Sequence, residues 1–401
     1  MPLSTALADW VGLSRDNRRI ALSLFVWAIG EGLFIYLIPL YLRELGADPV
    51  MIGAILGGEA IIAGLTHVPA GYLADRFGRK PVFVFAFGLG AAAALGMFLA
   101  RDLAQFVAAL VAYQLTAFLM APLTAYITEA RGTHSIQRAI SLVFTGYWAG
   151  LIFSPALGGL LARSLGMRAL FGLGCGFLAL TILIQLWLTP QPAAPHPPGQ
   201  ARYTALFRNW RFLGFLGLML AALSAIQIGF PLMPNFIVEV RGFDVGVVGL
   251  LGSVNSLGAT VLHLVLGDRL PRRAFMLAQL SQALALALLL ATASLPWLLV
   301  AYFLRAGWFL ARSMATAQVG RVVASSELGL ALGLTETVIT LALVGGPLIA
   351  GLLYHQAPAL PFQVSLALIA VTLPLMWRYA PRRDSPTPDH AAGRPPALPE
   401  T

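Results

Sequence analysis

The sequence predicts an all-α membrane protein with twelve transmembrane helices arranged as two six-helix pseudo-symmetric bundles. Three observations lead to this prediction: an apolar composition, recurring apolar runs of membrane-spanning length, and a motif repeated on both sides of a proline-rich linker. The chain has 401 residues, of which 58% are hydrophobic and only 11% are charged, and its mean hydropathy is +0.80. Soluble domains contain about 25% charged residues, so this composition excludes an ordinary soluble fold.

The predicted helices are the long apolar runs between residues 18 and 379. Each run can cross a hydrocarbon core of about 30 Å as a helix, and helices are expected because lipid cannot satisfy an open backbone. The predicted spans are 18–43, 50–74, 82–100, 103–128, 138–162, 168–188, 210–238, 246–267, 274–293, 296–321, 329–353 and 360–379.

Composition also sets the domain boundaries. Residues 189–209 are rich in Pro at first and basic later, which is typical of a linker, and we expect this linker to be cytoplasmic. The Pro-rich segment 381–401 is expected to be a disordered cytoplasmic tail. The linker and the tail delimit two predicted domains: an N-terminal six-helix bundle at 1–188 and a C-terminal six-helix bundle at 210–380.

The basic residues follow the predicted topology. On the side of the N-terminus lie 19 Lys and Arg residues, against 5 on the other side. This asymmetry predicts a multi-pass protein of the inner or plasma membrane with both termini in the cytoplasm. It accounts for the net charge of +9 without nucleic acid as a partner. The single cysteine, Cys175, excludes an internal disulfide.

Two sequence matches relate the halves. The segment GYLADRFGRKP, residues 71–81, contains LADRFGRKP, which aligns with LGDRLPRRA, residues 266–274, at an offset of 193. The segment SPALGG, residues 154–159, aligns with GPLIAG, residues 346–351, at an offset of 192. Two matches at nearly one offset favour an internal duplication. The charged residues aligned in the first match are Asp75, Arg76, Arg79 and Lys80 with Asp268, Arg269, Arg272 and Arg273.

With these features the chain resembles the major facilitator superfamily of transporters from about residue 18 to 379. Residues 71–80 resemble motif A of that superfamily, G-x-L-x-D-R-x-G-R-[KR], through Gly71, Asp75, Arg76, Gly78, Arg79 and Lys80. The resemblance implies that Asp75 faces the N-terminus of the eleventh helix in the outward-open state and that Arg79 pairs with Glu129. A loop with both signs of charge can bind in one conformation and be released in the other. The alternative is that these charges only enforce the topology.

The fifth predicted helix resembles motif C, which is associated with proton-coupled drug antiporters, although Ser154 replaces the Gly before the proline. Small residues would let the fifth and eighth helices approach closely, and plain packing would require the same residues. The fourth helix lacks the intramembrane Arg of motif B. The motif C-like residues are Gly146, Gly150, Pro155, Gly158 and Gly159.

Ionisable side chains at membrane depth are costly unless they pair, neutralise or face water, so each is a candidate functional residue. Glu31, followed by Tyr36, is the first candidate for a proton carrier or a ligand for a cationic substrate. A protonated acid in a packing hydrogen bond is the alternative. Glu59 is a second candidate.

On the tenth predicted helix, Arg305 and Arg312 lie seven residues apart and therefore on one helix face. Arg312 is expected to pair with Glu336 of the eleventh helix, since an isolated charge in low dielectric is unfavourable. This pair could be structural or could be a switch that responds to substrate, so both residues are candidates for proton coupling or substrate binding. Arg305 has no evident partner and could bind an anionic group. Aromatic residues that could line a site for an amphiphile are Tyr36, Tyr113, Tyr147, Trp148 and Trp308.

The sequence contains no nucleotide-binding loop, catalytic triad or metal-ligand cluster, so we expect no enzyme activity, no cofactor and no metal. The leading interpretation is a monomeric secondary transporter in the lipid bilayer that works by alternating access. In this interpretation it exports lipophilic or cationic small molecules in exchange for protons. Two alternatives remain: a proton symporter or uniporter for a polar or anionic metabolite, and a non-transporting receptor or scaffold on the same fold.

Overall fold

The computed structural model describes residues 12–191, 209–262, 265, 274–312 and 328–379. Within these ranges every regular element is helical and no strand is present, which confirms the predicted all-α fold. The elements of the N-terminal half are α2 (Arg15–Gly32), η1 (Ile35–Leu37), α3 (Ile38–Glu44), α4 (Pro49–Phe77), α5 (Arg79–Leu99), α6 (Leu103–Gln114), η2 (Leu115–Leu119), α7 (Met120–Glu129), α8 (Ile136–Leu165) and α9 (Met167–Leu186). Those of the C-terminal half are α11 (Trp210–Ile228), α12 (Met233–Glu239), α13 (Val245–Leu262), α14 (Ala274–Ala291), α15 (Leu295–Arg305), α17 (Leu328–Gln356) and α18 (Leu360–Tyr379).

Ten segments of the described chain are long and apolar enough to cross a membrane. The predicted span 274–293 corresponds to a shorter apolar helix, Phe275–Ala291, and the span 296–321 is described only as far as residue 312. A total of twelve spans therefore stays a prediction. The predicted linker and tail lie almost wholly outside the described residues.

Four predicted spans are broken rather than continuous. A short 3-10 turn interrupts the first span at Ile35–Leu37 and the fourth at Leu115–Leu119. The helix of the seventh span is interrupted between Ile228 and Met233, around Pro231, and that of the tenth span is interrupted at Ala306. Breaks at membrane depth are tolerated where neighbouring helices satisfy the freed backbone groups.

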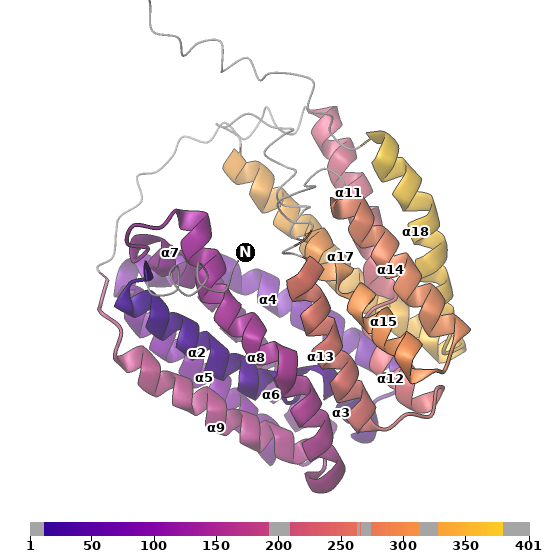
Figure 1. Cartoon of the computed structure of the whole chain (residues 1–401), viewed down its shortest axis with the longest axis horizontal. Coiled ribbons are helices and arrows are strands. Elements are labelled where there is room, and N and C mark those ends of the chain that lie inside the picture. The colour runs from indigo at the N-terminus through magenta and orange to yellow at the C-terminus, as the bar shows by residue number, and fades with distance from the viewer. Residues whose placement is uncertain (1–11, 192–208, 263–264, 266–273, 313–327, 380–401) are drawn as a thin grey trace, which may run out of the picture.

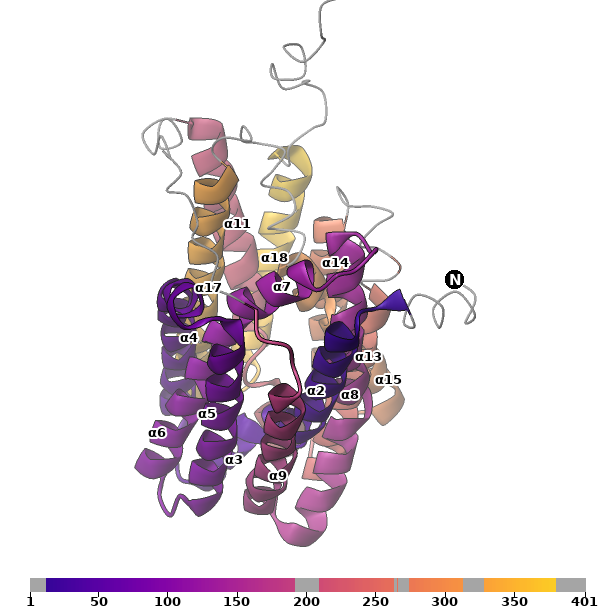
Figure 2. The same ribbon diagram turned by 90° about the vertical axis from the view of Figure 1, so that its left-hand side faces the viewer.

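The two halves pack against each other through two helix pairs, α8 with α13 and α4 with α17. We call the face where α2 and α11 begin the terminal face, and the face where α3 and α12 end the opposite face. Figure 2 shows many of the helices running roughly between these faces. In Figure 1, α3 and α12 lie near each other, whereas the terminal-face ends of α7 and α11 lie far apart.

The halves are tied together at the opposite face. Arg43 Nε donates to Glu239 Oε1 at 3.0 Å, and Asn235 Nδ2 donates to the carbonyl oxygen of Pro39 at 3.3 Å. Arg163, at the end of α8, makes a bidentate pair with Asp244, just before α13. These contacts close the opposite face in this structure.

Candidate functional site

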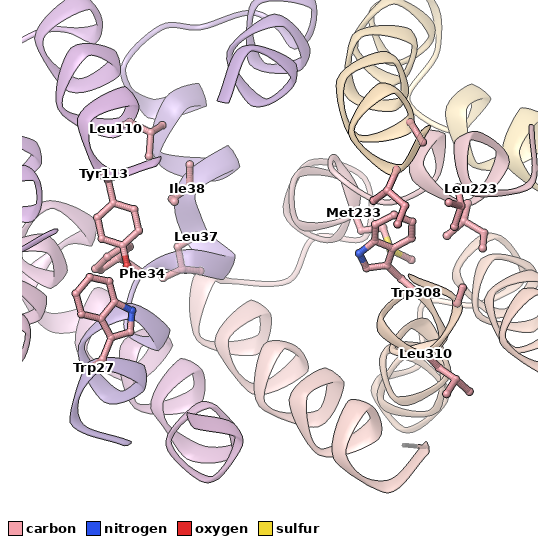
Figure 3. Close-up of a cluster of buried hydrophobic side chains, with 14 of the residues drawn as sticks. Trp27, Phe34, Leu37, Ile38, Leu110, Tyr113, Leu223, Met233, Trp308 and Leu310 are labelled. Atoms are coloured by element: carbon pink, nitrogen blue, oxygen red, sulfur yellow. The ribbon is translucent and has the colours of Figure 1, made fainter. Parts of the chain in front are cut away.

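Glu31 lies in the last turn of α2, and two donors hold one of its carboxylate oxygens. The indole Nε1 of Trp27, one turn earlier, lies 3.1 Å from Glu31 Oε2, and the hydroxyl of Tyr147 in α8 lies 2.9 Å from the same oxygen. The Trp27 ring stacks on Tyr113 with their centroids 5.9 Å apart. Figure 3 shows these two rings facing each other, with Phe34 close to them. The carboxylate is thus held beside aromatic side chains of its own half, those of Trp27, Tyr113 and Tyr147.

The glycines on either side of Glu31 allow α2 to lie very close to two neighbours. A Cβ atom at Gly30 would lie 2.9 Å from the carbonyl oxygen of Gly174 in α9. A Cβ atom at Gly32 would overlap the hydroxyl of Ser154, which donates to the carbonyl oxygen of Ala28 at 3.0 Å. Ser154 is the residue that departs from motif C, and in this chain its hydroxyl occupies the space that Gly32 leaves.

Tyr36, in η1, connects the two halves near the middle of the molecule. Its hydroxyl accepts a hydrogen bond from Asn255 Nδ2 at 2.9 Å and lies 3.1 Å from Ser256 Oγ, both in α13. Its ring packs on Gly252, where a Cβ atom would lie 2.7 Å from Tyr36 Cγ. Tyr36 does not bond to Glu31 directly.

Arg305 is the last residue of α15, and it is only 3% exposed. Its Cζ lies 3.6 Å from the centroid of the Phe230 ring and 5.2 Å from that of Tyr302. Nη2 donates to the carbonyl oxygen of Phe230 at 3.4 Å, whereas Nε and Nη1 have no hydrogen-bond partner among the described residues. Tyr36, from the other half, lies in the neighbourhood of the guanidinium without a hydrogen bond to it.

A one-residue turn at Ala306 separates Arg305 from Arg312, so the two do not lie on one continuous helix and their common face stays a prediction. Arg305 is buried, whereas the side chain of Arg312 is 48% exposed. The predicted ion pair with Glu336 is confirmed: Arg312 Nη2 lies 3.9 Å from Glu336 Oε2. The Glu336 side chain is 54% exposed, so the protein itself does not bury this pair.

Glu59 lies apart from the hydrogen bonds around Glu31. It is 8% exposed in α4, and Gln114 Nε2 of α6 donates to its Oε2 at 2.7 Å. Its Oε1 has no partner in the described part of the chain. Because α4 and α6 belong to the same half, Glu59 is held by a contact within that half.

The motif A segment is only partly described. Gly78 has φ of 81°, a conformation that favours glycine, and it forms the turn between α4 and α5. Arg79 follows and pairs with Glu129 at the end of α7, as the resemblance implies. Lys80 Nζ donates to the carbonyl oxygen of Leu186 at 2.7 Å. Gly71 lies in α4, whereas the side chain of Asp75 and the second-half residues Asp268, Arg269, Arg272 and Arg273 lie outside what the structure describes.

The motif C-like glycines divide into two groups. Gly158 packs on Leu33 within the same half, and Gly146 and Gly150 likewise pack on α2. Gly159 packs on α13 of the other half, where its Cβ atom would lie 2.9 Å from Gly249 Cα. The predicted close approach of the fifth and eighth helices is confirmed at Gly159.

Several residues around the site were not anticipated from the sequence. Trp27 carries a signal in retrospect, because it lies four residues before Glu31 on the same helix face. Asn255 and Ser256 are adjacent polar residues inside an apolar helix, which is typical of a contact between helices. Phe230 follows a helix break and has no comparable signal. Over the described ranges, no group of three or more His, Cys, Asp or Glu residues could hold a metal ion.

Two helical bundles, tied at one face and enclosing buried polar and charged side chains where they meet, have the architecture of a membrane transport protein. A family model described as Major Facilitator Superfamily matches residues 20–267 and 227–400. The chain belongs to this superfamily and is a membrane transporter, not an enzyme.

Known proteins are similar over most of the chain. It is 25% identical over 382 residues to Multidrug resistance protein 1 of Bacillus subtilis (strain 168), which covers 89% of this chain and 94% of the relative. It is 26% identical over 317 residues to a probable 3-phenylpropionic acid transporter of Escherichia coli (strain K12), covering 74% of this chain and 79% of the relative. The crystal structure of the nucleoside transporter NupG superposes with a TM-score of 0.74 at 16% identity, over 91% of this chain and 98% of NupG. That likeness concerns the fold alone.

Proposed function

We propose that this transporter is a proton-coupled antiporter that exports lipophilic small molecules, with Glu31 as the proton carrier. The observation that carries the proposal is a carboxylate at membrane depth, held by Trp27 and Tyr147 on the side of α2 that packs against α8. The likeness to a protein named for multidrug resistance supports a lipophilic cargo and export. The aromatic residues around Glu31 suit such a cargo.

Exchange at Glu31 follows from its two charge states. The protonated acid is neutral, so the site can close around it without burying a charge. The ionised acid uses the hydrogen bonds from Trp27 and Tyr147 and attracts a cationic group. If proton and substrate compete for this carboxylate, each leaves as the other binds, which is the simplest route to antiport.

The ties at the opposite face supply one end of an alternating-access cycle. The excess of Lys and Arg on the terminal face supports placing that face, and both termini, in the cytoplasm. With this orientation the closed opposite face is the outer one, and the structure is an inward-facing state. Export then requires the pairs of Arg43 and Arg163 to break while Asp75 engages the start of α17 at the cytoplasmic side.

The test replaces Glu31 by Gln in purified protein reconstituted into liposomes. Gln keeps an oxygen that accepts from Trp27 and Tyr147, so the fold is expected to persist while proton exchange is lost. Uptake of a panel of lipophilic cations, neutral compounds and anions is measured with and without an imposed pH gradient. We expect Glu31→Gln to abolish accumulation driven by the gradient.

Glu59→Gln is the matched control, because it makes the same chemical change at another buried acid that is held within its own half by Gln114. It is expected to keep gradient-driven accumulation. Near-native uphill transport by Glu31→Gln would remove Glu31 as the coupling residue. Loss of transport in Glu59→Gln alone would assign the coupling to Glu59.

A further inference from the structure

We infer that Arg305 forms an anion subsite at the junction of the halves, which takes a carboxylate or similar group attached to an aromatic or apolar body. The inference rests on the proposed function in that it adds a second requirement for the cargo, an acidic group for Arg305, beside the cationic group that Glu31 would attract. It concerns residues of α15, α11 and η1 rather than the Glu31 carboxylate.

The donors at this subsite are unused. A guanidinium has five N–H donors in a planar fork, and here Nε and Nη1 carry donors with no partner among the described residues. The hydroxyl of neighbouring Tyr302 also lacks a partner within the described chain. Buried donors are almost always satisfied in folded proteins, so unused ones beside each other indicate a ligand that accepts hydrogen bonds.

The charge at this subsite is also uncompensated. The rings beside the guanidinium are those of Phe230 and Tyr302, and no ion pair joins Arg305 to a carboxylate among the described residues. The Phe230 ring, 3.6 Å from Cζ, stabilises the cation through its π face. That contact satisfies neither Nε nor Nη1, because both donors point in the plane of the guanidinium. An anion supplies both the missing charge and the missing acceptors.

The surroundings define what the anion is attached to. Phe230 and Trp308 lie with their ring centroids 6.1 Å apart, and in Figure 3 Trp308 lies beside Met233 in the C-terminal half. Tyr36 reaches this region from the N-terminal half. An aromatic or apolar body would pack against these rings while its acidic group binds Arg305. Because Tyr36 also contacts α13, a bound ligand would touch both halves at the position where they meet.

The test uses three probes with one body and different charges: 4-phenylbutyrate, its neutral amide, and the cationic 4-phenylbutylamine. Binding to the purified full chain in nanodiscs is measured by isothermal titration calorimetry without any ion gradient. In the unmodified protein we expect 4-phenylbutyrate to bind at least about tenfold more tightly than the amide, since charge-assisted hydrogen bonds differ from neutral ones by this order.

Arg305→Gln is expected to remove the preference for 4-phenylbutyrate while leaving the affinity for the amide within about twofold. Arg305→Lys is expected to keep part of it, since it restores the charge without the fork. Arg312→Gln is the control, because it removes a half-exposed arginine from the same region of the chain. It is expected to leave all three affinities unchanged.

Equal affinity of the unmodified protein for 4-phenylbutyrate and its amide would overturn the inference, and so would no binding of 4-phenylbutyrate at about 10 mM. Both outcomes are measured on the unmodified protein, so they do not depend on whether a variant folds. They are also independent of coupling: a preference for the anion combined with no pH-driven transport would refute the proposed antiport and leave the subsite intact.

Discussion

Gly249, in α13, is the position where a single methyl group would separate the two halves at the opposite face. A Cβ atom there would lie 2.7 Å from Gly159 Cα in α8 and would overlap the carbonyl oxygen of Pro155. Ordinary contacts of a Cβ atom begin at 3.4 Å, and the Pro155 oxygen would lie only 2.3 Å away, so the two backbones must separate by about 1.1 Å. Backbone atoms cannot rotate away as a side chain can, so the helices themselves must move.

The size of the effect follows from this overlap. Overpacking of a close contact costs about 1–3 kcal/mol, and here the cost falls only on the state in which α8 and α13 touch. A bias of this size changes the ratio of two conformations by about 5- to 150-fold. Gly249→Ala is therefore expected to reduce the population closed at the opposite face. Gly159→Ala, whose Cβ atom would lie 2.9 Å from Gly249 Cα, is expected to have a smaller effect.

Double electron–electron resonance measures this change. Spin labels at Ala104→Cys and Ala293→Cys are exposed and lie at the opposite face of different halves, with Cys175 replaced by Ala. Gly249→Ala is expected to lengthen the main distance or add a longer one. Gly158→Ala is the control, because its Cβ atom would lie 2.7 Å from Leu33 Cα within the same half. It should lower the melting temperature without moving the labels apart. A distance distribution unchanged by Gly249→Ala would refute this account of the closed face.

Two further predictions concern polar contacts. Arg163 holds the pKa of the Asp244 carboxyl below its usual range, so their pair stabilises the closed opposite face at neutral pH and this stabilisation is lost as the pH falls through the lowered pKa. The labelled protein should therefore shift partly toward the open state in acid, since an exposed pair contributes at most about 1 kcal/mol and the Arg43–Glu239 contact remains. Asp244→Asn should show the same partial shift at every pH; an Asp244→Asn protein with unmodified distances at neutral pH would contradict this. Replacing Gln114 by Leu leaves Glu59 without its described donor and is expected to destabilise the fold by about 1–3 kcal/mol. Thermal melts in detergent measure this change, and an unchanged melting temperature would show that the contact is dispensable.

The positions of the helices could be predicted from the sequence, whereas most of the breaks within them could not; the break around Pro231 is the exception, because proline interrupts a helix. Most predicted boundaries fall within about four residues of those observed, because lipid makes apolar length a direct signal of a helix. The turn at Ala306 has no comparable signal, so the sequence did not reveal that Arg305 and Arg312 lie on separate helical segments. The candidate residues were identified by the free-energy cost of placing an ionisable side chain in a membrane. This criterion finds Glu31, Glu59 and Arg305 but does not reveal their partners.

Partners depend on how helices from distant parts of the sequence meet. The resemblance to motif A predicted the pair of Arg79 with Glu129. The similar membrane depth of Arg312 and Glu336 on neighbouring helices predicted the second pair. No local pattern indicates that Tyr147 reaches Glu31 across 116 positions or that Tyr36 contacts α13. These contacts come from close backbone approaches at glycines, and a small residue alone does not reveal which neighbour it faces.

The contact between Gly32 and Ser154 restricts how this protein can diverge. A side chain at 32 and a hydroxymethyl group at 154 would compete for one volume, so neither position is free to vary independently. Gly32→Ala should be tolerated only after Ser154→Gly has occurred. The change at 154 also restores the glycine that motif C has before the proline. In a library randomised at both positions, functional clones should carry one small residue and one larger residue, and seldom two larger ones.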